Sequence, residues 1–465
     1  MRSTTRGRGA VAVAGGLGLA LVLAACTAPP EDGGNNAGGG GDSGGGDVSE
    51  ECQEYVDTYG DLSGTEVRVY TSITSPEQET HEASYDVFEE CTGVTIVYEG
   101  SREFEAQLPV RVQAGNAPDI AYVPQPGLLN TLVTDFPDAV QPVGELAESH
   151  VDEFYGEDWK GYGTVDGTFY GTPLGANVKS FVWYSPSMFA DAGYEIPETW
   201  DELIALSDDI VANGGTPWCA GIGSGDATGW PATDWLEDVL LRSAGPDVYD
   251  QWVTNEVPFD APEIVEAMDY VASILKNPEY VNAGYGDVSS IATTEFTDGG
   301  YPILDGDCWL HRQASFYQAQ WPVYQEDVVV AEDGDVFAFY FPPIDPANQP
   351  VLGGGEFVVA FSDRPEVQAF QAFLASPEWT NAKLEASGPG WVSANNAQDT
   401  SLYESPIDAL SAELLADPNR TFRFDGSDLM PGAVGAGSFW SEMTAWIATD
   451  KPTEDVLAAI QASWP

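Results

Sequence analysis

Strand-like and helix-like segments alternate from about Gly64 onward, and this alternation constrains the fold more than any other feature. Runs rich in β-branched and aromatic residues occur at 66–70, 94–98 and 119–123. Between them the sequence has helix signals, as at residues 104–114. Alternating β and α segments predict an α/β fold in layers, with mostly parallel sheets.

Three stretches have the composition of a helix N-terminus. Ser75-Pro76-x-Gln78 combines a capping serine, a proline in the first turn and a capping-box glutamine, and its helix is expected to end near Gly93. Thr199-Trp-Asp-Glu202 is a second capping box, followed by apolar residues at helical spacing. Asp363-Arg-Pro-Glu366 is expected to cap a third helix.

The chain is too long for one hydrophobic core. About 400 residues follow the N-terminal segment, whereas single cores stop growing beyond about 250–300 residues. Hydrophobic residues make up 43% of the sequence and aromatic residues 12%, which is enough to build cores. We therefore expect two lobes.

Residues 1–25 have the layout of a secretory signal peptide. Arg2, Arg6 and Arg8 precede an uncharged apolar run at residues 10–25, which is shorter than the roughly 20 residues that span a bilayer as a helix. We therefore expect the protein to be exported.

The signal ends in Leu23-Ala24-Ala25-Cys26, which resembles the bacterial lipobox. In that motif the chain is cut before the cysteine, and the thiol takes a diacylglycerol. Cys26 would then hold the protein on the outer face of the cell membrane; the alternative is an ordinary signal with a chance cysteine. Residues 26–49 are Gly-rich and acidic, and we interpret them as the lipid anchor and a flexible tether.

Four cysteines remain after Cys26, an even number that suggests two disulfides in an exported chain. Sequence alone permits three connectivities among them. A metal site is the competing interpretation, but no CxxC occurs and the three histidines are scattered. We expect no metal and no cofactor. The four residues are Cys52, Cys91, Cys219 and Cys308.

The chain is strongly acidic. It has 16 Lys and Arg against 75 Asp and Glu, which gives a net charge of −59. Such a chain should repel nucleic acid and anionic lipid headgroups, so we expect no nucleic-acid partner. We interpret the acidity as a solvated surface that aids solubility, in preference to a role in binding a cationic ligand.

Several motifs, in their order along the chain, resemble one family. They are Gly115-Asn-Ala-Pro-Asp-Ile-Ala121, Asp166-Gly-Thr-Phe-Tyr-Gly-Thr-Pro173 and Ile196-Pro-Glu-Thr-Trp-Asp-Glu-Leu203. The chain from Cys26 resembles an extracellular solute-binding lipoprotein of a carbohydrate importer of the ABC type, in the broad class of maltose-binding protein. This resemblance implies a bilobed α/β fold of the periplasmic-binding-protein kind.

Further motifs resemble the α-glucoside-binding subgroup of this family. The pair Cys219 and Cys308 also belongs to that subgroup, and we expect the pairings Cys52–Cys91 and Cys219–Cys308 because each pair falls on one lobe. The motifs are Gly100-Ser-Arg-Glu-Phe-Glu-Ala-Gln107, Ala227-Thr-Gly-Trp-Pro-Ala-Thr-Asp-Trp235, Cys308-Trp-Leu-His-Arg-Gln313 and Asp428-Leu-Met-Pro-Gly-Ala-Val-Gly435.

The resemblance implies three chain crossings between the lobes, which we place near residues 174–176, 351–354 and 390–392. Gly353-Gly-Gly355 suits a hinge because glycine absorbs large changes in φ and ψ, although a plain turn would also explain it. The expected lobes are residues 62–174 plus 354–390 for the first, and residues 176–351 plus 392–465 for the second.

Sugar binding needs flat aromatic faces, which stack on pyranose rings, and planar polar groups, which meet the hydroxyls. The chain has 14 tryptophans, and four are candidates for stacking, by the resemblance or by their place in loops. These are Trp230, Trp309, Trp391 and Trp440. The polar candidates follow strand ends, follow the first crossing or lie in the subgroup motifs, and some could instead form salt bridges within the protein. These are Ser72, Thr74, Arg102, Glu103, Gln125, Asn177, Asp234 and Arg312.

The resemblance implies a binding protein without catalytic activity. The lobes would close on an α-glucoside or related oligosaccharide, and the closed monomer would deliver it to a membrane permease. ATP would be used by a separate subunit, since this chain has no G-x-x-x-x-G-K-[ST] motif. The alternatives are a secreted glycoside hydrolase and a binding protein for another solute, such as a peptide or a polyamine.

Overall fold

The structure, a computed structural model, describes residues 50–281, 285–387, 389–417 and 419–465. The predicted signal peptide, the predicted lipidation site Cys26 and the tether lie outside the described residues. Among the described helices, none has the length and the apolar character needed to cross a membrane.

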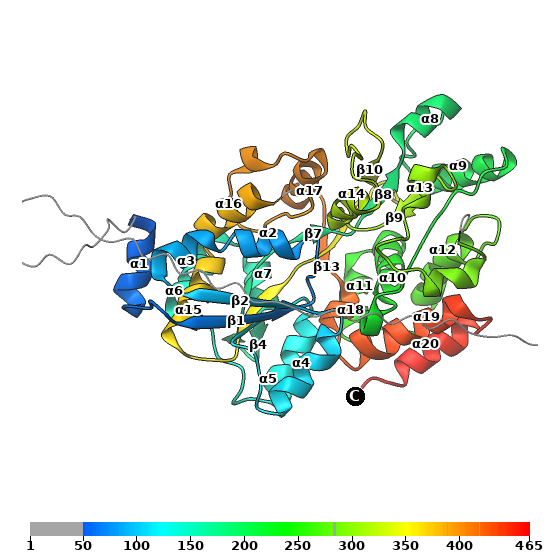
Figure 1. The fold of residues 1–465 in the computed structure, drawn as a ribbon. Coiled ribbons are helices and arrows are strands. Elements are labelled where there is room, and N and C mark those ends of the chain that lie inside the picture. The colour runs from blue at the N-terminus through cyan, green and yellow to red at the C-terminus, as the bar shows by residue number, and fades with distance from the viewer. Residues whose placement is uncertain (1–49, 282–284, 388, 418) are drawn as a thin grey trace, which may run out of the picture. The chain divides into compact units, whose positions relative to one another are not determined.

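A five-stranded sheet is built mainly from the N-terminal part of the chain (Figure 1). β1 is parallel to β2 and β3, as expected. Most pairings among the described strands are antiparallel, however, so the prediction of mostly parallel sheets is wrong. β12 comes from much later in the chain and is antiparallel to both of its neighbours, β3 and β6. In spatial order the strands are β2 (Thr95–Gly100), β1 (Glu66–Thr71), β3 (Ile120–Val123), β12 (Phe357–Ala360) and β6 (Gly171–Pro173).

Both faces of the central strands of this sheet are buried, as expected where helices cover a sheet on two sides. Val69 and Tyr122 point to one face and belong to a core with residues of α1, α3, α15 and α16. Tyr70 and Val123 point to the other face and belong to a core with residues of α4 and α5. Figure 1 shows the late helix α15 near the early elements α3 and β1. The helices are α1 (Glu50–Tyr59), α3 (Asp86–Thr92), α4 (Phe104–Gln113), α5 (Pro126–Asp135), α15 (Pro365–Leu374) and α16 (Pro377–Ala386).

Two predicted helix starts are wrong in detail. The helix expected from Ser75 begins only at Gln78, because Ser75 and Pro76 lie in a turn in which the Thr74 carbonyl accepts from the following amides. That helix also breaks into α2 (Gln78–Ala83) and α3, which ends at the expected Gly93. The cap of α15 is Arg364 rather than Asp363, and Pro365 occupies the first turn.

A second lobe surrounds a three-stranded antiparallel sheet with the order β10-β8-β9. Its large core is rich in buried tryptophan and includes Trp183, Trp218, Trp252 and Trp321. The strands are β8 (Phe181–Tyr184), β9 (Leu310–Arg312) and β10 (Phe337–Tyr340). The helices are α8 (Pro186–Ala192), α9 (Trp200–Ala212), α10 (Trp230–Ser243), α11 (Pro246–Val253), α12 (Pro262–Leu275), α13 (Pro302–Asp305), α14 (Trp321–Tyr324), α19 (Trp440–Ala448) and α20 (Thr453–Gln461).

A third, small sheet joins segments that the sequence predicts as lobe crossings. β11 (Val351–Gly354) lies between β7 (Asn177–Val178) and β13 (Phe422–Phe424), and Ala176 forms a separate bridge with Val392. The three expected crossings are therefore neighbours in space. The exact lobe boundaries stay predictions.

The glycines at these crossings allow a close approach of two backbones. A Cβ on Gly355 would lie 2.2 Å from the carbonyl oxygen of Gly175, and one on Gly353 would lie 2.6 Å from that of Asn177. Neither Gly353 nor Gly355 has a positive φ. Glycine is thus needed at these two positions because a side chain would clash with the neighbouring backbone, and not because the backbone has an unusual conformation.

The remaining elements connect these layers. A short hairpin precedes β6, α6 and α7 pack near it, and α17 and α18 follow in the C-terminal part. Their bounds are β4 (Thr164–Val165), β5 (Thr168–Phe169), α6 (Glu145–Phe154), α7 (Glu157–Tyr162), α17 (Pro406–Ala416) and α18 (Gly426–Leu429), with 3₁₀ helices η1 (Gly225–Ala227), η2 (Val288–Thr293), η3 (Ser315–Gln320) and η4 (Thr400–Leu402), and a π-helical turn η5 (Val434–Phe439).

Candidate functional site

A pocket with a cavity volume of about 190 Å³ receives side chains from both lobes and from the crossings. The loops after β1 and β3 open onto it, at the carboxyl ends of parallel strands, where α/β folds bind ligands. Its lining consists of Ser72, Ile73, Thr74, Ser75, Glu77, Arg102, Glu105, Pro124, Gln125, Asn177, Lys179, Ser224, Ala227, Trp230, Phe296, Thr297, Phe316, Gln320, Gly354, Gly355, Glu356, Asp428 and Trp440.

The second lobe supplies an aromatic wall, made of Trp230, Phe296, Phe316 and Trp440. The Trp230 ring centroid lies 5.1 Å from that of Phe296 and 6.1 Å from that of Phe316. Trp440 is nearly buried, and its indole Nε1 donates to Ser427 Oγ over 3.3 Å. These rings present an apolar surface on which a flat ligand face can stack.

The lining also contains three glutamates from outside the aromatic wall, Glu77, Glu105 and Glu356. Burial raises the pKa of Glu77 to about 7, and the charge of Glu356 adds to this rise. Burial likewise raises the pKa of Glu356 to about 7, against the effect of Lys179 and of the buried Lys383. The pKa of Glu105 is raised by burial too. The site therefore contains carboxyl groups that lack the solvation they would have in water.

Lys179 lies at the base of the pocket as part of a buried ion network. Its Nζ is 3.0 Å from Asp234 Oδ1 and also donates to Asp425. The ammonium lies 5.2 Å from the centroid of the Trp230 ring. Burial alone would lower its pKa, but these two carboxylates hold the pKa well above its usual range. Lys179 is therefore charged and already neutralised by protein groups.

The carboxylates around Lys179 are also the one group in the described part of the chain with the spacing of a metal site. Asp234, Glu237 and Asp425 offer oxygens that lie within 4.8 Å of one another. The Lys179 ammonium hydrogen-bonds two of these three side chains. The protein's own lysine therefore supplies a positive charge to this carboxylate cluster.

Seven of the twelve predicted ligand contacts lie in the pocket lining. Two are aromatic, and the remaining five are polar side chains from the first lobe and the first crossing. They are Ser72, Thr74, Arg102, Gln125, Asn177, Trp230 and Trp440.

The other five are not among the lining residues. Asp234 and Arg312 lie behind the pocket, where Arg312 pairs with Asp238 at 2.9 Å and lies 3.9 Å from Asp234. Glu103 is exposed at the start of α4. A ligand contact by any of these residues stays a prediction that this pocket does not support.

Trp309 and Trp391 pack against other aromatic residues instead. The Trp309 ring lies 5.2 Å from that of Tyr194 and packs, partly buried, against the core of the second lobe. Trp391 lies edge-on to Trp379 at a centroid distance of 5.4 Å. Neither ring is among the residues that line the pocket.

The sequence-based selection missed Lys179, Glu356, Phe296 and Phe316, all of which line the pocket. Lys179 and Glu356 lie within three residues of predicted crossings, and this position in the sequence could have identified them as pocket residues. The two phenylalanines lie in segments without periodic pattern, and nothing local marks them.

An ion pair links the two lobes at the pocket. Arg102, at the start of α4, lies 3.3 Å from Glu295, which follows η2 in the second lobe. Both side chains are about half exposed, at 46% and 45%. This pair therefore connects the lobes without burying its charges.

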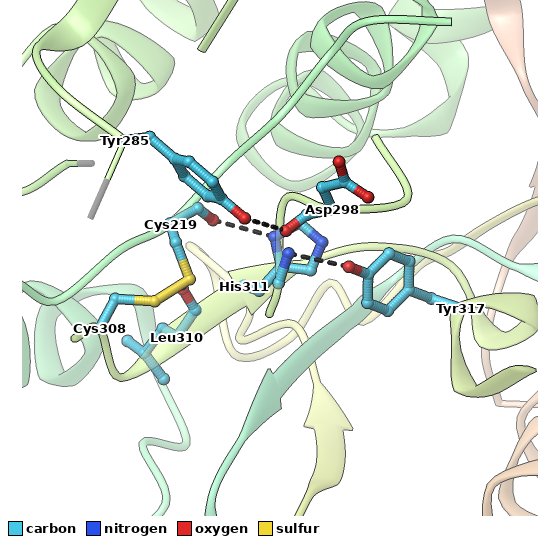
Figure 2. The surroundings of a disulfide bond; sticks show 8 residues. Cys219, Tyr285, Asp298, Cys308, Leu310, His311 and Tyr317 are labelled. Carbon is cyan, nitrogen blue, oxygen red and sulfur yellow. Dashed lines mark hydrogen bonds between the residues drawn. A yellow bond between two sulfur atoms is a disulfide. The ribbon is translucent and has the colours of Figure 1, made fainter. Parts of the chain in front are cut away.

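A disulfide and its surroundings fix the segment that carries Phe296 and Thr297. Cys219 pairs with Cys308, as predicted, with 5.9 Å between their Cα atoms. Figure 2 shows His311 Nδ1, which donates to the Cys219 carbonyl at 2.9 Å, and Tyr285, whose hydroxyl donates to the Asp298 carbonyl at 2.6 Å. Burial lowers the pKa of His311 to about 4, so this ring is neutral at pH 7.

Tyr317 completes this support. Its hydroxyl accepts from the Gly300 amide and donates to the Thr297 carbonyl, each at 2.8 Å (Figure 2 shows the first bond). The segment after the pocket residues is thus held at several points. The other predicted pairing, Cys52–Cys91, involves the Cys52 side chain, which lies outside the described residues, and stays a prediction.

Comparison with known proteins identifies the family. Residues 71–381 match the family model described as bacterial extracellular solute-binding protein. The osmoprotective compounds-binding protein GgtB of Synechocystis sp. is 39% identical over 412 residues, which cover 87% of this chain and 94% of that protein. The alpha-glucosides-binding periplasmic protein AglE of Rhizobium meliloti is 36% identical over 416 residues, covering 87% and 88%.

Solved structures show the same fold at low sequence identity. The bacterial solute receptor AcbH is 18% identical with a TM-score of 0.70, covering 86% of this chain and 97% of its own. The maltose-bound MalE3 of T. maritima is 16% identical with a TM-score of 0.64, covering 86% and 98%. These likenesses confirm the predicted bilobed α/β fold. With the family model and the two relatives that span most of its length, the chain belongs to the family of bacterial extracellular solute-binding proteins.

Proposed function

We propose that this protein binds an α-glucoside or a related oligosaccharide in the pocket between its lobes. The observation that carries the proposal is the combination of an aromatic wall with polar groups in one lining. The rings of Trp230, Phe296 and Phe316 can stack on the C–H faces of a pyranose, while carboxyl and amide groups of the same lining can accept from its hydroxyls. The relative named for binding α-glucosides supports this ligand class.

The bound sugar would be delivered to an ABC permease that has a separate ATPase subunit. In this proposal residues 1–25 are removed as a signal peptide, and lipid on Cys26 holds a monomer at the outer face of the membrane through the tether of residues 26–49. Closure of residues 62–174 plus 354–390 against residues 176–351 plus 392–465 would enclose the ligand. Pocket residues on both sides of the crossings support this arrangement.

The test is a titration of protein expressed from the full coding sequence, followed by calorimetry and by tryptophan fluorescence. The panel contains maltose, sucrose, trehalose, a β-linked disaccharide, glucose and a peptide mixture, and each mixture is analysed for products. We expect saturable binding of an α-glucoside without cleavage. A fluorescence change is expected too, because Trp230 lines the pocket.

Three outcomes would contradict the proposal. Binding of peptides alone would leave the family assignment intact and remove the sugar assignment. Release of a monosaccharide from a bound disaccharide would favour the glycoside hydrolase. A Trp230→Phe variant that binds with unchanged affinity and an unchanged signal would place the ligand elsewhere.

A further inference from the structure

The cationic side chains that line the pocket are already paired with protein carboxylates. Arg102 lies 3.3 Å from Glu295, and Lys179 lies 3.0 Å from Asp234 and also donates to Asp425. Each of these two cations therefore has a protein carboxylate as a partner, although Arg102 is about half exposed.

The carboxyl groups of the lining, in contrast, have no ion-pair partner in the described part of the chain. Within the described residues, Glu77, Glu105, Glu356 and Asp428 form no ion pair with a lysine, arginine or histidine. Burial raises the pKa of each, to about 7 for Glu77 and Glu356. Poor solvation therefore disfavours the charged form of these carboxyl groups, and a cation placed beside them would stabilise it.

Amide oxygens of the lining point to the same kind of ligand. Gln125 is only 5% exposed, and its Nε2 donates to Glu105 Oε1 at 3.3 Å, which fixes the orientation of the amide. Its Oε1 is buried and has no hydrogen-bond partner among the described residues. The same holds for Asn177 Oδ1. Because buried acceptors are nearly always satisfied, these two oxygens require donors, which a bound ligand or a bound water can supply.

We propose that this pocket selects sugars by charge, binding a glycoside with a primary ammonium group more tightly than its neutral parent and rejecting glycosides with a phosphate or carboxylate. The inference rests on the proposed function, because it presumes a sugar in this pocket. It assigns to the carboxyl groups of the lining a role in choosing the ligand, in addition to accepting from hydroxyls.

The hydrogen-bonding chemistry of the ammonium, hydroxyl and phosphate groups explains this expected order of affinities. An ammonium group has three donors and no acceptor, so it satisfies carboxylates and amide oxygens together. Charge-assisted hydrogen bonds are roughly twice as strong as neutral ones. A hydroxyl can donate once. A phosphate brings only negative charge and acceptors to a lining rich in acceptors, which repel it.

The experiment compares three probes on one scaffold: α,α-trehalose, 6-amino-6-deoxytrehalose and trehalose 6-phosphate. Where the sugar panel selects another α-glucoside, the same substituents are placed on its primary hydroxyl. Calorimetry at pH 7 uses protein expressed from the full coding sequence. We expect the amine to bind about tenfold more tightly than the neutral sugar, and the phosphate at least about a hundredfold more weakly.

Variants assign the effect to the pocket. Glu356→Gln and Glu77→Gln keep a planar polar group and remove a charge, so each should reduce the preference for the amine to about threefold or less. The matched control is Glu263→Gln, an exposed glutamate in the first turn of α12. It should leave the preference unchanged, because exposed charges are screened by salt.

Each outcome decides between the proposals. If no neutral sugar binds, the proposed function fails. If the neutral sugar binds and the amine binds no better, or the phosphate binds equally well, charge selection is overturned and the proposed function stands. If the preference for the amine survives both pocket variants but disappears in 0.5 M salt, the acidic surface attracts the amine and the pocket assignment is wrong. The wild-type comparison remains decisive if a variant fails to fold.

Discussion

Lys179 is the residue on which the charge balance behind the pocket depends. It is 6% exposed, and it lies between Asp234 and Asp425, both of which are buried as well. Against the effect of burial, its ammonium lowers the pKa of Asp425 below the usual range, so that carboxylate is ionised. Removal of the lysine would leave a buried charge without a counter-charge.

We therefore predict that Lys179→Met lowers the free energy of unfolding by about 3–5 kcal/mol, because removal of one member of a buried ion pair leaves the other charge uncompensated. Urea denaturation followed by circular dichroism measures it. The matched control is Arg68→Met, which removes an exposed ion pair with Glu66 and should lower the free energy of unfolding far less. Equal losses in the two variants would show that Lys179 contributes no more than a surface residue.

Single residues of the site were only partly predictable from the sequence. Trp230 and Trp309 each lie in a motif of the same subgroup, yet only the first lines the pocket. The second packs, partly buried, against Tyr194 and a core. A tryptophan ring buries the same area against a ligand as against a protein neighbour. Which of these it contacts depends on elements distant in the sequence, and local pattern does not contain that information.

At the scale of elements, the disulfide joins two segments that flank the pocket wall. The cysteines are 89 residues apart in sequence, and both are buried. Between them the chain forms α10, which begins with Trp230, and then returns through Phe296 and Thr297. One covalent bond thus closes the loop that contains much of the aromatic wall.

The double variant Cys219→Ala/Cys308→Ala should be destabilised by about 4–5 kcal/mol, because the unfolded chain regains the freedom of a long loop. Affinity for the sugar should fall as well, since the segment of Phe296 loses its anchor. Urea denaturation and calorimetry measure the two effects. Cys219→Ser/Cys308→Ser serves as a comparison, since it leaves polar groups at buried positions. A double alanine variant with unchanged stability would refute the prediction.

Elements with complete local signals were predicted best. The capping box of α9 is present, with Thr199 accepting from the Glu202 amide and Glu202 accepting from the Thr199 amide. The start at Ser75 had an equally good composition, but the chain forms a turn there, next to the pocket. Tertiary contacts outweigh a cap that contributes only about 1 kcal/mol. The position of β12 in the first sheet was unpredictable for a similar reason, because pairing partners far apart in sequence leave no local trace.

For the whole molecule, the dominant electrostatic property is a net charge of −59. Like charges spread over a folded surface repel one another, and this repulsion is relieved when the chain unfolds and expands. Most acidic side chains have no cationic partner, since the chain has 75 acidic and 16 basic residues. Stability should therefore depend on the ionic strength.

We predict that sodium chloride raises the thermal midpoint, with most of the rise below about 0.15 M, where the screening length has shrunk to about 8 Å. Differential scanning calorimetry from 0.01 to 1 M salt measures this, and sucrose, which stabilises without screening, is the control. A rise that begins only above that concentration would point to salt exclusion from the surface instead of relief of repulsion.

The contact between Gly175 and Gly355 limits how this chain can diverge in evolution. Any side chain at Gly355 would collide with a main-chain oxygen of a different crossing, and a main-chain atom cannot move aside as a flexible side chain can. A change at this position cannot be rescued by a second substitution at Gly175, because the obstructing carbonyl is present in every amino acid. Acidic residues on the surface can be substituted freely, and substitutions in the pocket can change which ligand it binds. This glycine must be inherited unchanged for as long as the crossings keep their present spacing.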